Sequence, residues 1–298
     1  MAETATLSPV LAMLIGLVVA GVMSTGGLTG AFILLPFQVS VLGFVAPAVT
    51  PTNHLYNVIA IPAGVYRYAR EGRMLWALAA ILAAGTVPGV ILGSLVRIHL
   101  LPDPRWFKLF VGLVLVLIGG QLLGRRRARG ARRPAARHAQ SMRVTMRRLD
   151  WRRLEYRYDG RDHGAPVVPL VLLTAVVGVI GGAYGIGGGA LIAPLLITRW
   201  SLPVHTITGA TLFATFLTSA TGVLVFQLYG SVAGLEQVTP HWGTGLAFGA
   251  GGLVGTYTGA ALQRHLPARA IETFLGCVIT VLGVAYVVRA LAGLAARG

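Results

Sequence analysis

Two glycine-rich clusters are the candidates for ligand binding in this sequence. The first is STGGLTG at Ser24–Gly30, and the second is GGAYGIGGG at Gly181–Gly189. Each interrupts a long apolar block and is followed by a proline, Pro36 or Pro194, six residues beyond the last aligned glycine. Unwound backbone exposes amide N–H groups, and the N-terminus of the following half-helix carries about half a positive charge, so such a break suits a small anion. A plain helix kink without a ligand is the alternative.

The expected ligand groups are backbone amides, and the chemistry is not that of a nucleotide-binding loop. Gly185–Gly189 does not satisfy GxGxxG, is not followed by a lysine, and lies in an apolar block in which no strand–turn–helix unit can be drawn. The glycines expected to contribute are Gly26, Gly27 and Gly30 in the first cluster, and Gly185, Gly187, Gly188 and Gly189 in the second.

Polar side chains follow the breaks in both halves, just after Pro47 and Pro203. They are hydroxyl and amide donors without carboxylates, which could solvate an oxyanion. Serine and threonine also bond their own helix backbone, so about half of them are expected to be structural. The groups are Thr50, Thr52, Asn53, His54 and Asn57, and His205, Thr206, Thr208, Thr211, Thr215, Thr218, Ser219 and Thr221; the expected ligands are Thr52, Asn53, Asn57, Thr208 and Thr211.

Proton coupling, metal binding and hydrolysis have little support in the sequence. His54 and His205 are proton-coupling candidates because imidazole changes charge near neutral pH, but ordinary interfacial histidines are an equally good interpretation. The acidic residues nearest the apolar blocks lie at block ends, and the chain has no H-x-x-x-H pattern, no cysteine pair and no nucleophile elbow. We therefore expect no metal, no cofactor and no enzymatic activity. The single cysteine, Cys277, is expected to be buried and inert.

The composition requires a membrane protein to position these residues. Of 298 residues, 55% are hydrophobic and only 11% charged, and the mean hydropathy is +0.74. Backbone polar groups in hydrocarbon must be paired internally, and the alternating polarity of a β-barrel is absent, so the spans must be helices. The predicted fold is an all-α polytopic bundle with eight apolar blocks at residues 7–42, 49–68, 75–98, 106–123, 167–198, 204–229, 243–262 and 268–291.

The chain is an internal duplication. Two registers hold between its halves: Gly27, Gly30 and Pro36 match Gly185, Gly188 and Pro194, and Gly85, Gly89, Gly93 and His99 match Gly251, Gly255, Gly259 and His265. The predicted units are an N-terminal repeat at 1–124, a loop at 125–165 and a C-terminal repeat at 166–298. Because its twin is internal, the first block is expected to be mature sequence and not a cleaved targeting peptide. The glycines spaced by four are assigned to helix packing.

The first block of each half is too long for one crossing. Residues 167–198 would extend about 48 Å as a straight helix, against about 30 Å of hydrocarbon, so we expect a broken or re-entrant helix in each half. A hairpin at the break makes the halves inverted repeats, whereas a single long crossing makes them parallel. The inverted arrangement is favoured because it agrees better with the distribution of basic residues.

Most of the net charge of +16 belongs to one segment. The loop at 125–165 holds 14 of the 25 basic residues and four of the nine acidic ones, so it is expected to be cytoplasmic and to lie near anionic lipid head groups. Alternating apolar residues at 144–158 predict a small hairpin there. Residues 230–242, which have no arginine, should face outside. Nucleic-acid binding is not expected, and the basic residues that do not fit this orientation are Arg97, Arg105, Lys108, Arg289 and Arg297.

Two halves that each open with a glycine-broken helix and a proline resemble the sulfite exporter TauE/SafE family. The motifs are GIGGGALIAP at Gly185–Pro194 and the weaker TGGLTGAFILLP at Thr25–Pro36, in which Thr29 and Ala31 replace the glycines of the second half. The resemblance covers nearly the whole chain. It implies a bacterial inner-membrane secondary carrier of small sulfur anions such as sulfite or organosulfonates.

Two expectations about function follow. In the first, the two breaks face each other around an oxyanion, and one half rocks against the other to alternate access. In the second, the protein is a membrane-embedded scaffold that acts through its basic loop. A homodimer stays open as an alternative to a monomer.

Overall fold

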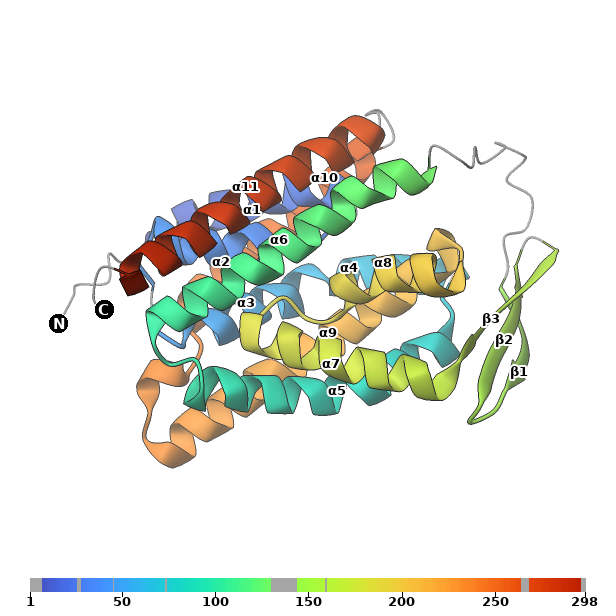
Figure 1. Ribbon diagram of the computed structural model, residues 1–298, viewed down its shortest axis with the longest axis horizontal. Coiled ribbons are helices and arrows are strands. Elements are labelled where there is room, and N and C mark those ends of the chain that lie inside the picture. Colours follow the sequence, from blue (N-terminus) through green and yellow to red (C-terminus); the bar gives the residue numbers. More distant parts are fainter. Residues whose placement is uncertain are drawn as a thin grey trace.

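The computed structural model describes residues 7–25, 28–44, 46–72, 74–129, 144–158, 160–263 and 268–295. These residues form a bundle of helices with a three-stranded sheet at one end (Figure 1). The helices are α1 (Pro9–Thr25), α2 (Ala31–Ser40), α3 (Val49–Ala60), α4 (Pro62–Arg70), α5 (Trp76–His99), α6 (Pro104–Arg129), α7 (Val167–Tyr184), α8 (Gly189–Trp200), α9 (Val204–Ala233), the 3-10 turn η1 (Glu236–Val238), α10 (Trp242–Gln263) and α11 (Ala268–Ala295).

The bundle is that of a helical membrane protein. Five helices among the described residues are long and apolar enough to cross a bilayer: they lie in Trp76–His99, Pro104–Gly124, Val167–Tyr184, Thr206–Ala233 and Thr273–Ala292. The apolar segments Pro9–Ser24 and Ala31–Ser40 are shorter. The expectation of a helical membrane fold is therefore confirmed, while the count of eight spans stays a prediction.

Each first block is broken at its glycine cluster. α1 ends at Thr25 and α2 begins at Ala31, and α7 ends at Tyr184 and α8 begins at Gly189. The second break has a local cause, because Gly185 caps α7 with φ +94° and its N–H bonds to the carbonyl of Gly181 at 2.8 Å. Such a left-handed conformation is open to glycine at little cost.

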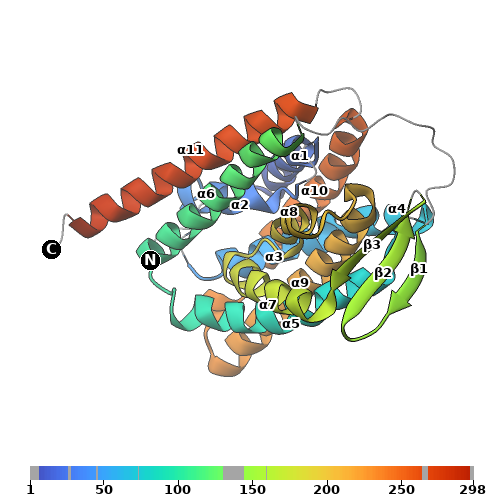
Figure 2. The same cartoon turned by 45° about the vertical axis from the view of Figure 1, so that its right-hand side comes forward.

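The chain turns back at the second break. α7 begins at Val167, directly after the last strand residue Pro166, so its first turn lies at the sheet. Thr206, six residues beyond the end of α8, bonds to Tyr156 of the sheet at 2.8 Å between hydroxyl oxygens. Both ends of the α7–α8 unit therefore lie near the sheet, and Figure 2 shows the two helices side by side.

The glycines spaced by four join the two halves. Gly85, Gly89 and Gly93 of α5 lie against α7, and Gly251, Gly255 and Gly259 of α10 lie against α1. At each of these six positions a Cβ atom would come within 3.0 Å of atoms in the partner helix, so the backbones are in direct contact. The expected packing role is confirmed. Each half's third apolar block packs on the first block of the other half, so the halves interlock.

Gly89→Ala is expected to destabilise the bundle because its Cβ would meet the Ala175 carbonyl oxygen and come within 2.9 Å of Gly178 Cα. Backbone atoms cannot move aside, so α5 and α7 would have to separate, at a cost of about 1–3 kcal/mol. Gly120→Ala is the control, because nothing lies within 4 Å of its added Cβ. It should gain about 0.5–1 kcal/mol from helix propensity. Thermal unfolding in detergent should shift in opposite directions, and equal shifts would contradict this packing.

The sheet consists of β1 (Thr145–Leu149), β2 (Arg153–Tyr158) and β3 (Arg161–Pro166), antiparallel in the order β1-β2-β3. The predicted hairpin is confirmed as β1–β2. The third strand was missed because RDHGAP has no apolar alternation. Leu154, Tyr156 and Tyr158 are buried along one face of β2, so the sheet packs on the bundle. The expected burial of Cys277 is wrong, because this residue is exposed on α11.

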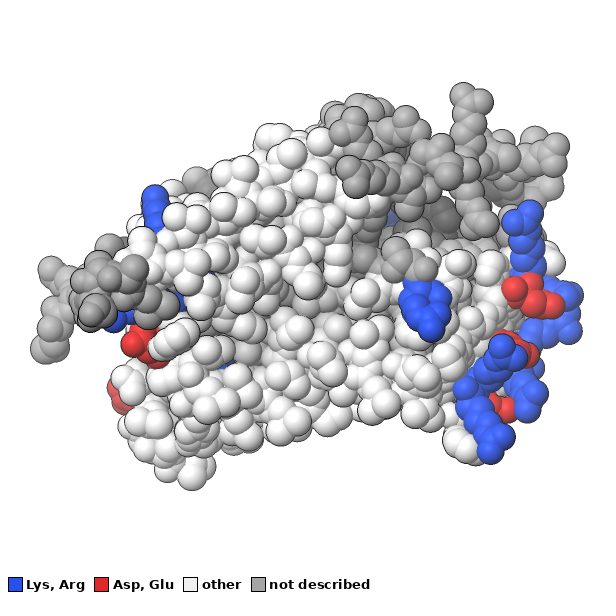
Figure 3. All heavy atoms as spheres, viewed as in Figure 1, with Lys and Arg blue, Asp and Glu red and all other residues white. Residues whose placement is uncertain are grey.

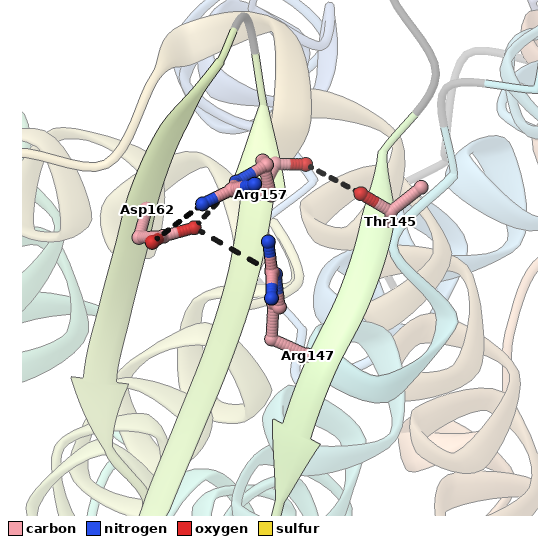
Figure 4. A network of polar contacts seen from close by, with 4 residues as sticks. All are labelled: Thr145, Arg147, Arg157 and Asp162. Carbon is pink, nitrogen blue, oxygen red and sulfur yellow. Dashed lines mark hydrogen bonds and ion pairs between the residues drawn. The ribbon is translucent and has the colours of Figure 1, made fainter.

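Charged side chains gather over the sheet, whereas most of the adjoining face is uncharged (Figure 3). Within the sheet, Arg157 donates to both carboxylate oxygens of Asp162, at 2.9 and 3.1 Å, as Figure 4 shows. Arg147 Nε lies 3.9 Å from Asp162 Oδ1, and Thr145 Oγ1 donates to the Arg157 carbonyl at 3.5 Å. The hydrogen bonds from Arg157 hold the pKa of Asp162 below its usual value.

Acid is expected to loosen the β2–β3 pair. Because the folded pKa of Asp162 is lowered, its contribution to stability is complete above the unfolded pKa of about 3.9 and is lost as pH falls through the folded value. Hydrogen–deuterium exchange of residues 153–166, corrected for intrinsic rates, should show falling protection below about pH 4. Asp162→Asn should show the weaker protection already at neutral pH, and full protection in that variant would contradict the assignment.

Candidate functional site

The polar side chains of α3 form the centre of the candidate site. Five polar residues of this helix are fully buried: Thr50, Thr52, Asn53, His54 and Asn57. α3 contains no Asp, Glu, Lys or Arg. α3 packs against α2, α9 and α10 and contacts α7. Helices from both halves therefore surround it.

Asn53 joins the two helix breaks. Its Nδ2 donates to the carbonyl oxygen of Ala31 at 2.9 Å and to that of Gly185 at 3.0 Å. Ala31 is the first residue of α2, and Gly185 caps α7. Asn57, one turn further along α3, donates to the carbonyl oxygen of Ile186 at 3.1 Å. The segments on which the glycine clusters lie are thus brought to one helix.

These bonds define what the two asparagines do in this arrangement. Asn53 uses both Nδ2 hydrogens for protein carbonyls, so it positions the breaks and has none left for an anion. Within the described residues, Asn57 uses one of its two Nδ2 hydrogens. The Oδ1 atoms of both side chains are buried without a partner among the described residues.

The second break presents buried backbone donors. Within the described part of the chain, the N–H groups of Ile186, Gly187 and Gly188 make no hydrogen bond, although all three residues are buried. Gly187 has φ +70° and Gly188 is right-handed at φ −76° and ψ −28°. Alternating left- and right-handed residues turn successive N–H groups into a concave anion-binding nest. Buried N–H groups without a partner are rare in proteins, so these three are candidates for binding a ligand or a water molecule.

Threonines of α9 close the other side of this break. Thr215 Oγ1 accepts from the Gly189 N–H at 3.0 Å and donates to the carbonyl of Thr211 at 2.9 Å. The Thr211 hydroxyl donates to the carbonyl of Thr208 in its own helix at 3.0 Å, and Thr208 is half-buried. Thr215 of α9 thus reaches the break through a hydrogen bond, and it was not among the expected ligands.

Thr52 serves the start of α3. Its hydroxyl donates to the Ala48 carbonyl at 2.7 Å and accepts from the His241 N–H at 2.9 Å. It therefore ties α3 to the segment before α10, as expected for the structural share of these hydroxyls.

His54 lies between α7 and α9. Its Nδ1 is 3.3 Å from Ser219 Oγ, and its Nε2 is 3.4 Å from the Gly182 carbonyl. A neutral imidazole with the hydrogen on Nε2 satisfies both partners, because a carbonyl can only accept. The side chain of His205 lies outside the described residues, and the described His, Cys, Asp and Glu side chains form no group of three that could hold a metal ion.

The first break is described from Leu28 onward, so Gly26 and Gly27 lie outside the described residues. Gly30 is the N-cap of α2, and a Cβ there would come within 3.1 Å of Tyr56 Cζ. Thr29, which stands where the second half has Gly187, has a buried hydroxyl without a partner among the described residues.

Sequence reasoning missed Tyr184 and Arg97 at this site. Tyr184, directly before Gly185, donates its hydroxyl to the Phe32 carbonyl at 3.0 Å and so links the two breaks again. The sequence feature that could have indicated Tyr184 is a phenol hydroxyl inside an apolar block. Arg97 bonds to Thr50 and is fully buried. The sequence feature that could have indicated Arg97 is its position, which does not fit the predicted membrane orientation.

Comparisons with known proteins find a match over nearly the whole chain. The family model for Sulfite exporter TauE/SafE matches residues 12–286. A "Probable membrane transporter protein YunE" of Bacillus subtilis (strain 168) is 24% identical over 284 residues, covering 93% of this chain and 96% of that protein. A "Probable membrane transporter protein" of Xylella fastidiosa (strain 9a5c) is 25% identical over 90% of both chains. No solved structure matches significantly. The relatives named above are bacterial, and the chain belongs to the Sulfite exporter TauE/SafE family, a family of membrane transporters and not of enzymes.

Proposed function

We propose that the protein is a secondary carrier of small sulfur oxyanions, such as sulfite or an organosulfonate, and that the second break binds the anion. The observation that carries the proposal is the set of three buried N–H groups at Ile186, Gly187 and Gly188, which have no partner among the described residues. They precede the N-terminus of α8, where the helix dipole adds positive potential. The family match supports a sulfur anion as the substrate.

Neutral donors suit transport because the anion must also leave. Backbone amides in a buried site replace the hydration of the anion without the strong attraction of several fixed cations. Gly187 and Gly188 supply N–H groups in this shell, and the free Nδ2 hydrogen of Asn57 adds a side-chain donor. The first break, around Gly30, contributes from the facing side with fewer glycines, which makes the site asymmetric.

The site is closed in this structure, so transport requires helices to move. Gly185, Ile186, Gly187, Gly188 and Gly189 are all buried, as are the polar side chains of α3. The close contacts of α5 with α7 and of α1 with α10 oppose the rigid rotation of one sequence half against the other. We infer instead that the pair α5–α7 moves as one unit and the pair α1–α10 as another. α3 and the N-terminal part of α9 lie between these two pairs.

The halves are proposed to be inverted repeats with the basic loop in the cytoplasm. The return of α7–α8 to the sheet supports a hairpin, and a hairpin of this kind inverts one half relative to the other. The arginines of the sheet would then lie at the cytoplasmic surface, near anionic lipid. His54 stays the proton-coupling candidate because it contacts the last turn of α7.

A substrate panel tests the proposed function. Purified protein in proteoliposomes should take up radiolabelled sulfite or an organosulfonate at a saturable rate above that of empty liposomes, and sulfate should compete less well. An imposed pH gradient should change the rate if proton movement is coupled. Uptake no faster than in empty liposomes for every sulfur anion would contradict the proposal.

A further inference from the structure

Arg97 is a fully buried arginine at the end of an apolar helix. It lies in the last turn of α5, and its relative exposure is 0%. Its Nε donates to Thr50 Oγ1 at 3.2 Å, its Nη1 donates to the Leu101 carbonyl, and its guanidinium carbon lies 3.7 Å from the centroid of the Phe107 ring. Its Nη2 is buried and has no partner among the described residues.

No carboxylate balances this charge in the described part of the chain. Arg97 forms no ion pair there, and Asp103, the nearest acidic residue along the chain, is exposed and accepts from the N–H of Arg105. A buried guanidinium is expensive unless it is paired, and ionisable residues inside membrane bundles usually mark the route of an ion. The missing partner is therefore expected to be an anion that comes and goes.

A second unpartnered group lies on the same face of α5. Ser94 is fully buried, and its hydroxyl has no partner among the described residues. Residues three apart on a helix are neighbours on its surface, so Ser94 and Arg97 lie side by side on one face of α5. A hydroxyl and a guanidinium together supply the donors that an oxyanion accepts.

This cluster adjoins the second break. Thr50 accepts from Arg97 and donates to the Ala183 carbonyl at 3.2 Å, two residues before Gly185. A Cβ at Gly93, next to Ser94, would come within 3.0 Å of the Ala183 nitrogen. The end of α5 therefore touches the last turn of α7. It lies at the end of the bundle away from the sheet, as the junction of α5 and α6 in Figure 1 shows.

We propose that Arg97, with Ser94 and Thr50, forms a second anion-binding site that passes the oxyanion to or from the glycine break. Arg97 supplies the positive charge that the neutral break lacks, Ser94 adds a donor, and Thr50 holds the guanidinium and connects it to α7. The inference rests on the proposed anion transport. It places the anion's entry or exit on the side of the break away from the sheet.

A purely structural role for Arg97 makes a different prediction. As a cap for the Leu101 carbonyl, the arginine would stabilise the end of α5 but would not respond to anions. The distinguishing readout is the rise in melting temperature that an anion produces, because binding to the folded state adds stability according to ligand concentration and affinity. The melting temperature without an anion reports the structural role separately.

Arg97→Gln and Arg97→Lys are compared with wild type and with Arg105→Gln in full-length protein. Arg105 lies at the start of α6, is partly buried, and among the described residues donates its backbone N–H to Asp103 and nothing from its side chain. Thermal shifts are measured with sulfite, an organosulfonate, sulfate and nitrate, and sulfite uptake is measured in proteoliposomes.

Arg97→Gln should weaken the apparent affinity for the transported anion by about a hundredfold, as expected for loss of a buried charge partner. Arg97→Lys should lose about tenfold because it keeps the charge but not the planar donor geometry. Arg105→Gln should stay within twofold of wild type.

The outcomes separate this inference from the proposed function. If wild type and both Arg97 variants bind the same anion with the same affinity, the inference is wrong and the proposed function stands. If wild type responds to none of the anions, both are wrong. If Arg97→Gln does not fold, the affinity of Arg97→Lys for the transported anion decides. An affinity equal to that of wild type overturns the site. An affinity about tenfold weaker, with the four anions ranked as in wild type, supports it.

Discussion

Gly185→Ala is expected to reduce transport to less than a tenth of the wild-type rate. Gly185 has φ +94°, and a Cβ there would lie 2.6 Å from the Thr50 carbonyl oxygen. The left-handed conformation alone costs an L-residue about 1–2 kcal/mol. The clash is with backbone, so α3 and the end of α7 must also separate, which displaces the carbonyl that Asn53 holds.

Gly234→Ala is the matched control for this variant. Gly234 is the left-handed C-cap of α9 with φ +66°, as Gly185 is that of α7, but nothing lies within 4 Å of its added Cβ. It should carry the backbone strain alone and keep transport close to wild type. Rates and melting temperatures of both variants are to be measured in the same lipid. Equal losses in the two variants would mean that strain, and not the contact with α3, explains the effect.

Asn53→Ala is expected to have a comparable effect by another route. The substitution removes both hydrogen bonds that hold the carbonyls of Ala31 and Gly185, and leaves the buried Gly185 carbonyl without a partner among the described residues. An unsatisfied buried acceptor costs about 1–3 kcal/mol, and the lost bond to Ala31 adds about 0.5–1.5 kcal/mol. We therefore expect a loss of stability of about 2–4 kcal/mol and at least a tenfold lower transport rate, because the two breaks are no longer fixed to one helix.

Gln227→Ala removes an amide of the same chemical type without touching the breaks. Gln227 lies further along α9, where its amide bonds to Ser231 and Trp242 near the surface. This variant should transport at close to the wild-type rate. Wild-type transport by a correctly inserted Asn53→Ala protein would contradict the role of Asn53 as the link between the breaks.

Glycine spacing predicted much of the architecture because it acts through backbone geometry. Gly185 and Gly187 can adopt positive φ, and Gly89 or Gly255 permits direct helix contact, so both features can be read without knowing the neighbours. Which helices meet could not be read in this way. That α5 packs on α7 depends on the interlocking of the halves, which a linear pattern does not encode.

Side-chain roles were harder to predict than positions. Asn53 was expected to bind an anion, and its place beside both breaks is as expected, but both of its Nδ2 hydrogens are used by backbone carbonyls. An asparagine can donate to a ligand or to protein with the same sequence signal. Thr215 and Thr211 illustrate the same limit, because identical residues one turn apart bond to different partners. Arg97 departs from the predicted distribution of basic residues, and its proposed role depends on its burial, which the sequence does not state.

The most direct test of the account is counterflow of radiolabelled sulfite in proteoliposomes that contain wild type or Gly187→Leu. Gly187 has φ +70°, and even a Cβ there would lie 2.5 Å from Thr215 Cγ2, so a leucine must fill or distort the proposed anion position. Wild type should exchange labelled for unlabelled sulfite, and the correctly inserted variant should match empty liposomes. Wild-type exchange by Gly187→Leu, or no exchange by wild type with any sulfur anion, would contradict an anion site at the glycine break.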